Sequence, residues 1–278
     1  MSKKLLALFF VFALAFGSLM MVQGCAPADE GPTDGETGEV TEEGEVVEEM
    51  IKLKIATDAA YPPFESIDTK TSEIVGFDID FMKAIADAAG FEVEFVSVDW
   101  EGILIGLDAE KYDAVISAVS ITEERKKEYD YSEPYYAISQ ALLLKTEDAE
   151  GITILDDLAT KKIGAQNGTT GAIFIDNNKK VKLVPYKDNA LAIEALIRGD
   201  VAAVVCDHPV AFDYALKNNA YKGKLTVVNS DLNKGDLEEY GIVVKKGNSE
   251  ILELINKGLA EVKKGDKISE LEKKWGIK

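Results

Sequence analysis

Few side chains of this sequence are of the types that act as nucleophiles or bind transition metals. The 278 residues include one histidine, His208, and two cysteines, Cys25 and Cys206. These counts exclude multi-histidine metal sites, four-cysteine zinc sites and disulfide-rich scaffolds, and we predict no metal and no cofactor. Cys206 and His208 would share one face of a strand, which permits a thiol–histidine pair. A buried cysteine beside a histidine at the edge of a cleft is the interpretation we favour.

Polar and aromatic side chains follow the ends of several short apolar segments. In open α/β sheets, ligands bind at the carboxyl ends of the strands. This rule selects one set of candidate site positions: Asp58, Trp100, Ser117–Ser120, Gln166–Thr170 and Asp207.

The elements that must position these residues are predicted from periodicity. Alternating or buried apolar runs predict strands over 53–57, 92–98, 114–117, 162–166, 182–186 and 201–206. Helical spacing predicts helices over 77–89, 103–111, from about 170, and over 190–198, 209–218 and 251–262. We expect the helix over 190–198 to be capped by Asp188 or Asn189 and to end at Gly199, and the last helix to be capped by Asn248 or Ser249.

This alternation of strands and helices predicts mostly parallel sheets with helices on both faces. The pattern restarts near residue 162, which predicts two α/β lobes of similar size. The length is that of one or two domains, and the apolar fraction of 46% is enough for a core. The formal net charge of −19 argues against a protein that grips nucleic acid through its phosphates.

The N-terminal region carries targeting signals. Lys3 and Lys4 precede an apolar run over residues 5–22, which predicts a secretory signal over residues 1–24. The run ends in Val22-Gln23-Gly24-Cys25, which resembles a bacterial lipobox and implies lipidation of Cys25. An uncleaved membrane anchor is the alternative. Either version holds the protein to a membrane, outside the cytoplasm.

The segment over residues 25–50 follows as a tether. Residues 26–50 contain ten Asp or Glu, no Lys or Arg and no aromatic residue. Such a composition cannot bury enough apolar surface to fold, and its like charges extend it. We therefore predict an acidic, disordered spacer.

Four segments beyond the tether occur together in the order found in one protein family. They are Ala56-Thr57-Asp58-Ala59-Ala60-Tyr61-Pro62-Pro63-Phe64, Gly76-Phe77-Asp78-Ile79-Asp80, Tyr112-Asp113-Ala114-Val115-Ile116-Ser117-Ala118-Val119-Ser120-Ile121-Thr122-Glu123-Glu124-Arg125 and Gln166-Asn167-Gly168-Thr169-Thr170-Gly171. From about residue 51 to its end, the chain resembles the family 3 solute-binding proteins of polar amino-acid ABC importers. The third segment is the most specific of the four.

The resemblance implies a periplasmic-binding-protein-like fold of type II, α/β, in which each of two lobes is a sheet flanked by helices. Lobe 1 would comprise residues 51–138 and 243–278, and lobe 2 residues 144–236. Two hinge crossings, over 139–143 and 237–242, would join them. The implied function is that of a monomeric, non-enzymatic binding protein, which closes on one amino acid and delivers it to a transporter permease.

The resemblance also implies roles for individual residues. An amino acid carries a carboxylate and an ammonium, and burying either one unpaired costs several kcal/mol. Arg125 matches the arginine that grips the α-carboxylate, and its planar fork fits two oxygens. Asp207 matches the aspartate that accepts the α-ammonium.

Other positions match further contacts of the family. Ser120 and Thr170 match hydrogen-bond donors, and Thr170 also opens a helix whose free N–H groups suit an anion. Ala118 matches a position whose carbonyl accepts from the ammonium. Tyr61 and Trp100 match aromatic residues that sandwich the ligand side chain. The side chains expected around that part of the ligand are Asp58, Tyr61, Asp78, Trp100, Ser117 and Gln166.

Structural roles compete with each of these assignments. Arg125 stands in a charged run and could be a solvated helix residue. Asp207 could be a helix cap before Pro209. Tyr61 and Trp100 could be core residues, and Asp58 and Asp78 turn residues.

The identity of the ligand is left open among several amino acids. Two carboxylates and two aromatic residues favour a long cationic side chain, so arginine leads, followed by lysine or histidine. Glutamine is a close rival because Gln166 could exchange amide hydrogen bonds with it, and cystine is a further candidate.

Two other classes of function compete with the importer component. One is an enzyme on the same scaffold, a cyclohexadienyl or arogenate dehydratase, which needs a carboxyl general acid. Asp207 disfavours it, because such an enzyme has less use for an ammonium-binding aspartate. The other is an extracytoplasmic amino-acid sensor. We expect it to need a separate signalling partner, because we see no second membrane span or signalling module before Lys278.

Overall fold

The computed structural model describes residues 50–277. The predicted secretory signal over 1–24, the lipidation site Cys25 and the tether up to residue 49 lie outside the described residues. None of the helices within residues 50–277 has the length and apolar character needed to cross a bilayer.

The first lobe is built on a five-stranded sheet in the order β5-β1-β6-β15-β7. Its strands are β1 (Lys52–Thr57), β5 (Glu92–Ser97), β6 (Ala114–Val115), β7 (Tyr129–Tyr131) and β15 (Val243–Lys245). β1 pairs in parallel with β5 and β6, whereas β15 is antiparallel to both of its neighbours, β6 and β7. Four strands therefore run in one direction and β15 runs in the other.

The second lobe repeats this arrangement in the order β11-β10-β12-β9-β13. Its strands are β9 (Gln140–Lys145), β10 (Lys162–Gln166), β11 (Lys182–Tyr186), β12 (Ala203–Asp207) and β13 (Leu225–Asn229). Here β9 is the reversed strand, antiparallel to β12 and β13. The expectation of mostly parallel sheets therefore needs one correction per lobe: each sheet is mixed.

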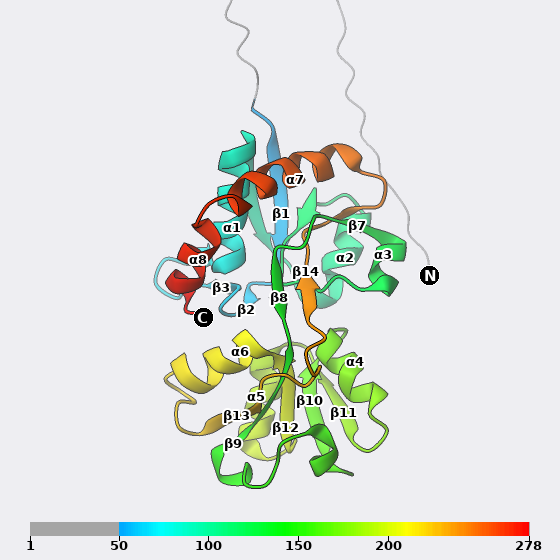
Figure 1. Cartoon of the computed structure of the whole chain (residues 1–278), viewed down its shortest axis with the longest axis vertical. Coiled ribbons are helices and arrows are strands. Elements are labelled where there is room, and N and C mark those ends of the chain that lie inside the picture. The colour runs from blue at the N-terminus through cyan, green and yellow to red at the C-terminus, as the bar shows by residue number, and fades with distance from the viewer. Residues whose placement is uncertain (1–49, 278) are drawn as a thin grey trace, which may run out of the picture. The chain divides into compact units, whose positions relative to one another are not determined.

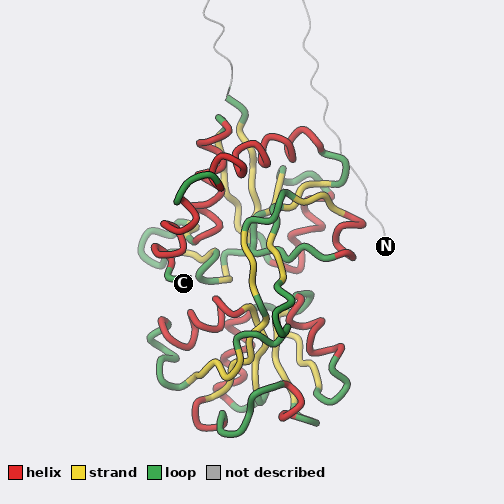
Figure 2. Tube along the Cα trace, in the orientation of Figure 1, coloured by secondary structure: helices red, strands yellow, loops and turns green. Residues whose placement is uncertain are grey.

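The reversed strand is, in each sheet, the first strand after the chain has passed from one lobe to the other. β8 (Tyr136–Ile138) leads directly into β9, and β14 (Glu238–Tyr240) leads into β15. β8 and β14 pair with each other in antiparallel fashion and run side by side between the lobes (Figures 1 and 2). A strand that enters a lobe from this connection begins at the edge that faces the other lobe. Its neighbours end at that edge, so the entering strand is antiparallel to them.

Helices flank the two sheets, as Figure 1 shows. The first lobe carries α1 (Phe77–Ala89), α2 (Trp100–Asp108), α3 (Glu123–Glu128), α7 (Ser249–Lys263) and α8 (Lys267–Trp275). The second carries α4 (Thr170–Asn177), α5 (Asn189–Arg198) and α6 (His208–Phe212), which continues as a π-helix over Asp213–Lys217. Two 3-10 turns, η1 (Thr146–Asp148) and η2 (Leu155–Leu158), follow β9.

Most predicted elements are present, several with shifted ends. The caps of α5 are Asp188 and Gly199, and α7 is capped by Asn248, as the sequence indicated. The helix predicted over 103–111 instead begins at Trp100 and ends at Asp108. The strand predicted over 201–206 instead covers Ala203–Asp207. Both shifts bring a candidate site residue, Trp100 or Asp207, onto the end of a regular element.

A small antiparallel sheet connects β1 to α1. It consists of β2 (Ala60–Tyr61), β3 (Glu65–Ile67) and β4 (Ile74–Val75). Gly76, at the start of α1, allows this sheet to lie directly against the helix, because a Cβ there would stand 1.9 Å from the carbonyl oxygen of Phe64.

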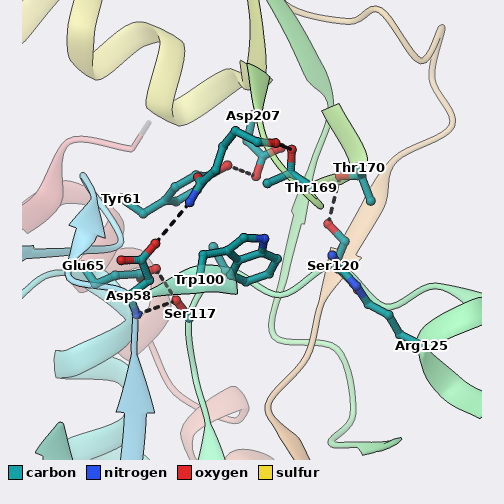
Figure 3. Close-up of a pocket in the computed structure, with 12 residues that line it drawn as sticks. Asp58, Tyr61, Glu65, Trp100, Ser117, Ser120, Arg125, Thr169, Thr170 and Asp207 are labelled. Carbon is teal, nitrogen blue, oxygen red and sulfur yellow. Dashed lines mark hydrogen bonds between the residues drawn. The ribbon is translucent and has the colours of Figure 1, made fainter. Parts of the chain in front are cut away.

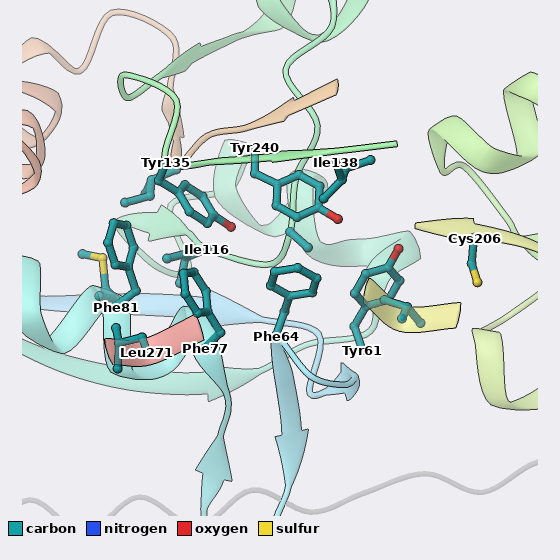
Figure 4. Packing of buried hydrophobic residues seen from close by; sticks show 14 of the residues in the cluster. Tyr61, Phe64, Phe77, Phe81, Ile116, Tyr135, Ile138, Cys206, Tyr240 and Leu271 are labelled. Carbon is teal, nitrogen blue, oxygen red and sulfur yellow. The ribbon is translucent and has the colours of Figure 1, made fainter. Parts of the chain in front are cut away.

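Aromatic side chains fill the core next to the lobe connection. The ring of Phe64 packs edge to face against those of Phe77, Tyr136 and Tyr240, and Phe77 packs in the same way against Tyr136. The ring centroids of these pairs lie 5.2–6.0 Å apart. Figure 4 shows this cluster extending from Phe81 and Tyr135 to Tyr61. Residues of the first lobe and of both connecting strands are thereby packed into one core.

Candidate functional site

A pocket lies where the carboxyl ends of the strands of both lobes meet. Ten of the residues that the sequence analysis proposed around the ligand line it, whereas Asp78 does not, and the individual roles of the ten stay predictions. The lining residues are Asp58, Tyr61, Glu65, Trp100, Ser117, Ala118, Ser120, Arg125, Gln166, Thr169, Thr170 and Asp207.

The topology explains why residues so far apart in the sequence converge. Asp58 directly follows β1, the stretch 117–120 follows β6, and Gln166 and Asp207 are the last residues of β10 and β12. The carboxyl ends of parallel strands lie at one edge of a sheet, and here the two edges face each other. Figure 3 shows Asp58, Glu65 and Ser117 on one side of Trp100, and Ser120, Arg125 and Thr170 on the other.

Arg125 is half-buried and is held in the pocket from three sides. Its Nη1 donates to the carbonyl of Ser120 at 2.9 Å, and its Nη2 donates to the carbonyl of Gly168 at 3.1 Å. The guanidinium also lies over the ring of Trp100, 5.3 Å from the ring centroid. The alternative of a solvated helix charge therefore does not describe Arg125, even though it belongs to the highly charged helix α3.

Gly168 contributes its carbonyl through a conformation that favours glycine. Its φ of +70° lies in the left-handed region, which a residue with a Cβ adopts only at a cost. In this conformation the carbonyl, which belongs to the second lobe, accepts from an arginine of the first.

Asp207 is buried, and both of its carboxylate oxygens accept hydrogen bonds. Tyr61 donates to Oδ2 at 2.6 Å, Tyr240 donates to the same oxygen, and Gln140 Nε2 donates to Oδ1 at 2.5 Å. Burial raises the pKa of Asp207 to about 6, although the tyrosine and glutamine hydrogen bonds oppose that shift. Asp207 occupies the N-cap position of α6, but its side chain makes no capping hydrogen bond and lines the pocket instead.

Asp58 occupies the opposite end of the pocket. Its Oδ2 accepts from Gln166 Nε2 of the second lobe at 3.1 Å, and its backbone N–H donates to Ser117 Oγ at 2.9 Å. Burial raises the pKa of Asp58 to about 6. Lys187 opposes this shift electrostatically, but its ammonium is ion-paired with Asp99 at 2.9 Å.

Hydroxyl groups line the pocket near the N-terminus of α4. Thr170 Oγ1 accepts from Gln140 Nε2 at 3.2 Å and lies 3.5 Å from Ser120 Oγ, which itself donates to Glu238 at 2.9 Å. Thr169 caps α4 by accepting from the backbone N–H of Ala172 at 3.3 Å. Free N–H groups in this first turn favour an anion.

Several hydrogen bonds and one ion pair join the two lobes directly around the pocket. Inside it, Tyr61 meets Asp207, Asp58 meets Gln166, and Arg125 meets the carbonyl of Gly168, as described above. At the rim, Asn167 Nδ2 donates to Glu101 Oε1 at 3.0 Å, next to the Lys187–Asp99 pair. These contacts describe lobes that are closed on each other.

One lining residue, Glu65, was missed by the sequence analysis, whereas Thr169 was selected as part of the stretch Gln166–Thr170 but without a role of its own. Glu65 directly follows the motif that ends at Phe64, so a signal for it was present next to residues that were selected. In contrast, Asp78 was expected to line the pocket, but it is fully buried behind it, where it accepts from the backbone N–H of Ala118 at 2.8 Å.

Cys206 and His208, which the sequence permits as a thiol–histidine pair, are both engaged in the packing and hydrogen bonding of the fold. Cys206 is buried in the core, and burial raises the pKa of its thiol. His208 accepts at Nδ1 from the backbone N–H of Ser139 at 3.2 Å. Within residues 50–277, no group of three or more His, Cys, Asp or Glu side chains is arranged to hold a metal ion.

Comparison with known proteins places this fold and site in context. The family model described as bacterial extracellular solute-binding proteins, family 3, matches residues 53–278. A probable histidine-binding protein of Neisseria gonorrhoeae is 32% identical over 229 residues, which cover 81% of this chain and 83% of that protein. The ABC transporter arginine-binding protein 1 of Escherichia coli K12 is 34% identical over 230 residues, covering 81% and 90% respectively.

A solved structure agrees in fold as well as in sequence. An ancestral arginine-binding protein bound to arginine superposes with a TM-score of 0.73 and is 40% identical, covering 81% of this chain and 97% of that protein. The family match over residues 53–278 spans the strands of both lobes.

Proposed function

The chain belongs to family 3 of the bacterial extracellular solute-binding proteins, and from this premise we propose that it captures one amino acid by lobe closure and delivers it to the permease of an ABC importer. The observation that carries the proposal is a single pocket lined by both Arg125 and Asp207. A half-buried cation and a buried anion on opposite lobes match the two charges of an α-amino acid.

The amino-acid head group would bridge the lobes. Two N–H groups of Arg125 are used by the carbonyls of Ser120 and Gly168, and the remaining donors of its fork are available for the α-carboxylate. Ser120, Thr170 and the first turn of α4 add donors on the same side. Asp207, together with the carbonyl of Ala118, would accept the α-ammonium.

The side chain of the ligand would extend toward Asp58, between the rings of Tyr61 and Trp100. Asp58, Glu65 and Ser117 gather there, with Gln166 facing Asp58 (Figure 3). Carboxyl groups without a cation among them favour a cationic side chain, so we rank arginine first, then lysine and histidine. Gln166 keeps glutamine as the next candidate.

Closure would take place about the two crossings, over residues 139–143 and 237–242, between lobe 1 (51–138 and 243–278) and lobe 2 (144–236). Strand β8 directly precedes the first crossing and β14 lies within the second, and the two strands are paired, so both connections would bend together. A ligand that touches both lobes binds the closed form better than the open one and shifts the population toward it. The permease would then recognise the closed form.

We place the protein outside the cytoplasm, where it would act as a monomer. After removal of residues 1–24, lipid on Cys25 would hold it to the membrane, and residues 25–50 would serve as a spacer. Two or three acyl chains anchor a protein stably, whereas one alone does not. Metabolic labelling with a fatty acid, and its loss in Cys25→Ser, tests the anchor.

We further propose that the pocket releases its ligand chemically unchanged. The observation in favour of the rival dehydratase is a buried carboxyl group, Glu65, which lines the pocket and whose pKa is raised by burial. A dehydratase would use such a group as a general acid. Asp207 argues against prephenate, which has no ammonium, whereas arogenate has one, so the turnover assay separates arogenate dehydration from simple binding. A sensor would use the same closure but would signal through a partner.

A panel of ligands separates these functions. The thermal midpoint of the purified protein is measured with each common amino acid, and the same preparation is assayed for turnover of prephenate and arogenate. A ligand at 100 times its Kd adds about 2.7 kcal/mol of stability, or very roughly 5–11 °C for a protein of this size. We expect such a shift with one or two amino acids and no turnover. Turnover without an amino-acid shift would replace the binding protein with the enzyme.

A further inference from the structure

Two buried carboxyl groups meet at the edge of the pocket: Glu65 lines it, and Asp78 lies behind it. Glu65 and Asp78 each have 0% of their surface exposed. Neither forms an ion pair with a lysine or arginine of the described residues. Ionised carboxylates are costly to bury without a counter-charge, so this pair needs another source of stabilisation.

The backbone brings the two carboxyl groups together. The N–H of Asp78 donates to the carbonyl of Phe64, the residue before Glu65, at 3.0 Å. Gly76 permits this approach, since any side chain at that position would collide with the carbonyl of Phe64. Strand β3 and the first turn of α1 are therefore in direct contact at these two residues.

One oxygen of each carboxyl group accepts a hydrogen bond from the turn formed by Ser117 and Ala118, which lines the pocket. Glu65 Oε1 accepts from Ser117 Oγ at 2.8 Å. Asp78 Oδ2 accepts from the backbone N–H of Ala118 at 2.8 Å and from Tyr135 Oη at 2.7 Å. Ala118 has a φ of +45°, a left-handed conformation that a non-glycine residue keeps only where its surroundings enforce it.

The second oxygen of each group, Glu65 Oε2 and Asp78 Oδ1, is buried and accepts no hydrogen bond from an N–H or O–H group of the described residues. Two acceptors without a donor leave both oxygens unsatisfied, and one proton between them would satisfy both. We propose that Glu65 and Asp78 share one proton, with Glu65 donating to Asp78, and that this carboxyl–carboxylate brace positions the Ser117–Ala118 turn for ligand binding.

The electrostatic surroundings agree with one shared proton. Burial and the Asp78 charge raise the pKa of Glu65 well above its usual range. The pKa of Asp78 is raised to about 7 by burial, while hydrogen bonds from Ala118, Tyr135 and Glu65 hold it down. The other titratable group that acts on Glu65 is Asp58, whose negative charge also favours the protonated form.

The brace makes a specific prediction for single and double variants. In Glu65→Gln, the amide N–H₂ can replace the shared proton as the donor to Asp78. In Asp78→Asn, the amide can donate to an ionised Glu65. The double variant has an amide on both sides. Either the two N–H₂ groups face each other, or one of them turns toward the Ala118 N–H or the Ser117 hydroxyl, and the hydrogen bond that the carboxyl group accepted there is lost.

The experiment measures thermal midpoint and ligand affinity for wild type, Glu65→Gln, Asp78→Asn and the double variant, with exposed Glu92→Gln as control. We expect both single variants to keep a midpoint close to that of wild type, and Asp78→Asn, whose residue does not line the pocket, to keep affinity within about threefold. The double variant should lose much more than the two single changes combined, in both readouts. Two ionised groups would give the opposite result: each substitution would relieve repulsion and raise the midpoint, the double most of all.

Infrared spectroscopy provides a readout that does not depend on ligand or on folding of the variants. At pD 8 in D₂O, wild-type protein should show the C=O band of a protonated, buried carboxyl group, and Glu65→Gln should lack it. Absence of that band from wild type overturns the shared proton. The affinity readout rests on the proposed function, whereas the band and the midpoints do not, so a failure of amino-acid binding leaves this test intact.

Discussion

The two ends of the pocket contain similar kinds of polar residue but balance their charges differently. At one end, Arg125 is matched by two backbone carbonyls and by the buried carboxylate of Asp207 in the same pocket. At the other end, Asp58 and Glu65 stand with hydroxyl and amide partners, and the nearby Lys187 is already paired with Asp99. The first end holds a cation among its carboxyl groups, Asp207 and Glu238, whereas the second holds carboxyl groups and, among the described residues, no unpaired cation.

The difference suggests a division of labour. A balanced end suits the constant zwitterionic head of any amino acid, whereas an acidic end suits only ligands that bring a positive charge. Affinity in general should depend on the first end, and discrimination among amino acids on the second. Each variant below is chosen to disturb one end and not the other.

Loss of Arg125 should have the largest effect. Arg125→Ala removes the partner of the α-carboxylate, and truncating one member of a buried charge pair costs about 2–5 kcal/mol of binding free energy. Calorimetric titration should show this loss for every amino acid that wild type binds. Arg198→Ala, which removes an exposed arginine ion-paired with Asp200, is the matched control and should bind like wild type. A loss below about threefold would reject the assigned role of Arg125.

Loss of the Asp58 charge should come next, and it should be selective. Asp58→Asn removes the negative charge but keeps a hydrogen-bonding side chain beside Gln166. A hydrogen bond to a charged group is worth about 1.5–3 kcal/mol, so the affinity for arginine should fall by that amount while the affinity for glutamine changes little. Competition binding between the two ligands measures the change directly, with exposed Asp87→Asn as control. Equal losses for both ligands would contradict a discriminating acidic end.

Acidification should weaken binding of a cationic ligand at both ends. In the free protein the pKa values of Asp58 and Asp207 are about 6, and a bound ammonium or guanidinium would lower them. Binding then releases protons below pH 6, so affinity falls as the pH drops from about 6 toward 4, by up to about tenfold per unit for each group. Titrations in buffers of different ionisation enthalpy should report that release. A flat affinity profile over this range would show that neither aspartate faces a ligand cation.

Asp207→Asn should weaken binding less than Arg125→Ala does. The amide oxygen can still accept from the ligand ammonium, and the hydroxyls of Tyr61 and Tyr240 can rotate to suit the N–H₂ group. We expect a loss of about 1 kcal/mol by calorimetry. A loss larger than that of Arg125→Ala would mean that the ammonium contact dominates binding.

The smallest effect should come from the rim. Lys187→Ala breaks the exposed ion pair with Asp99, and exposed pairs contribute about 0–1 kcal/mol. Affinity should therefore fall only slightly, and the difference from wild type should vanish at high salt. A large, salt-independent loss would move the control of closure from the pocket to its rim.

Much of this site could be predicted from the sequence because short apolar runs indicate where buried strands end. Asp58, Gln166 and Asp207 end or follow buried apolar runs, and the motif around Arg125 is specific. The fold followed from the same alternation, except where a short element leaves little signal. α8 was missed because only Ile268, Leu271 and Trp275 mark its apolar face within a strongly charged segment.

Other features could not be predicted, since they depend on contacts between distant segments. The reversal of β9 and β15 comes from the path of the chain between the lobes, which periodicity does not record. The exposure of Glu65 to the pocket and the burial of Asp78 behind it depend on how β3 meets α1. The Tyr240–Asp207 contact joins a lobe connection to the site, and no spacing rule indicates such a pair.

The central claim is that one molecule bridges the two charges of the pocket. Calorimetric titration of arginine against two analogues tests it most directly: agmatine lacks the α-carboxylate, and 5-guanidinopentanoate lacks the α-ammonium. Because each analogue leaves a buried partner without its counter-charge, we predict that both bind at least about 30-fold more weakly than arginine. Agmatine binding as tightly as arginine would contradict the claim, since Arg125 would then have no carboxylate to hold.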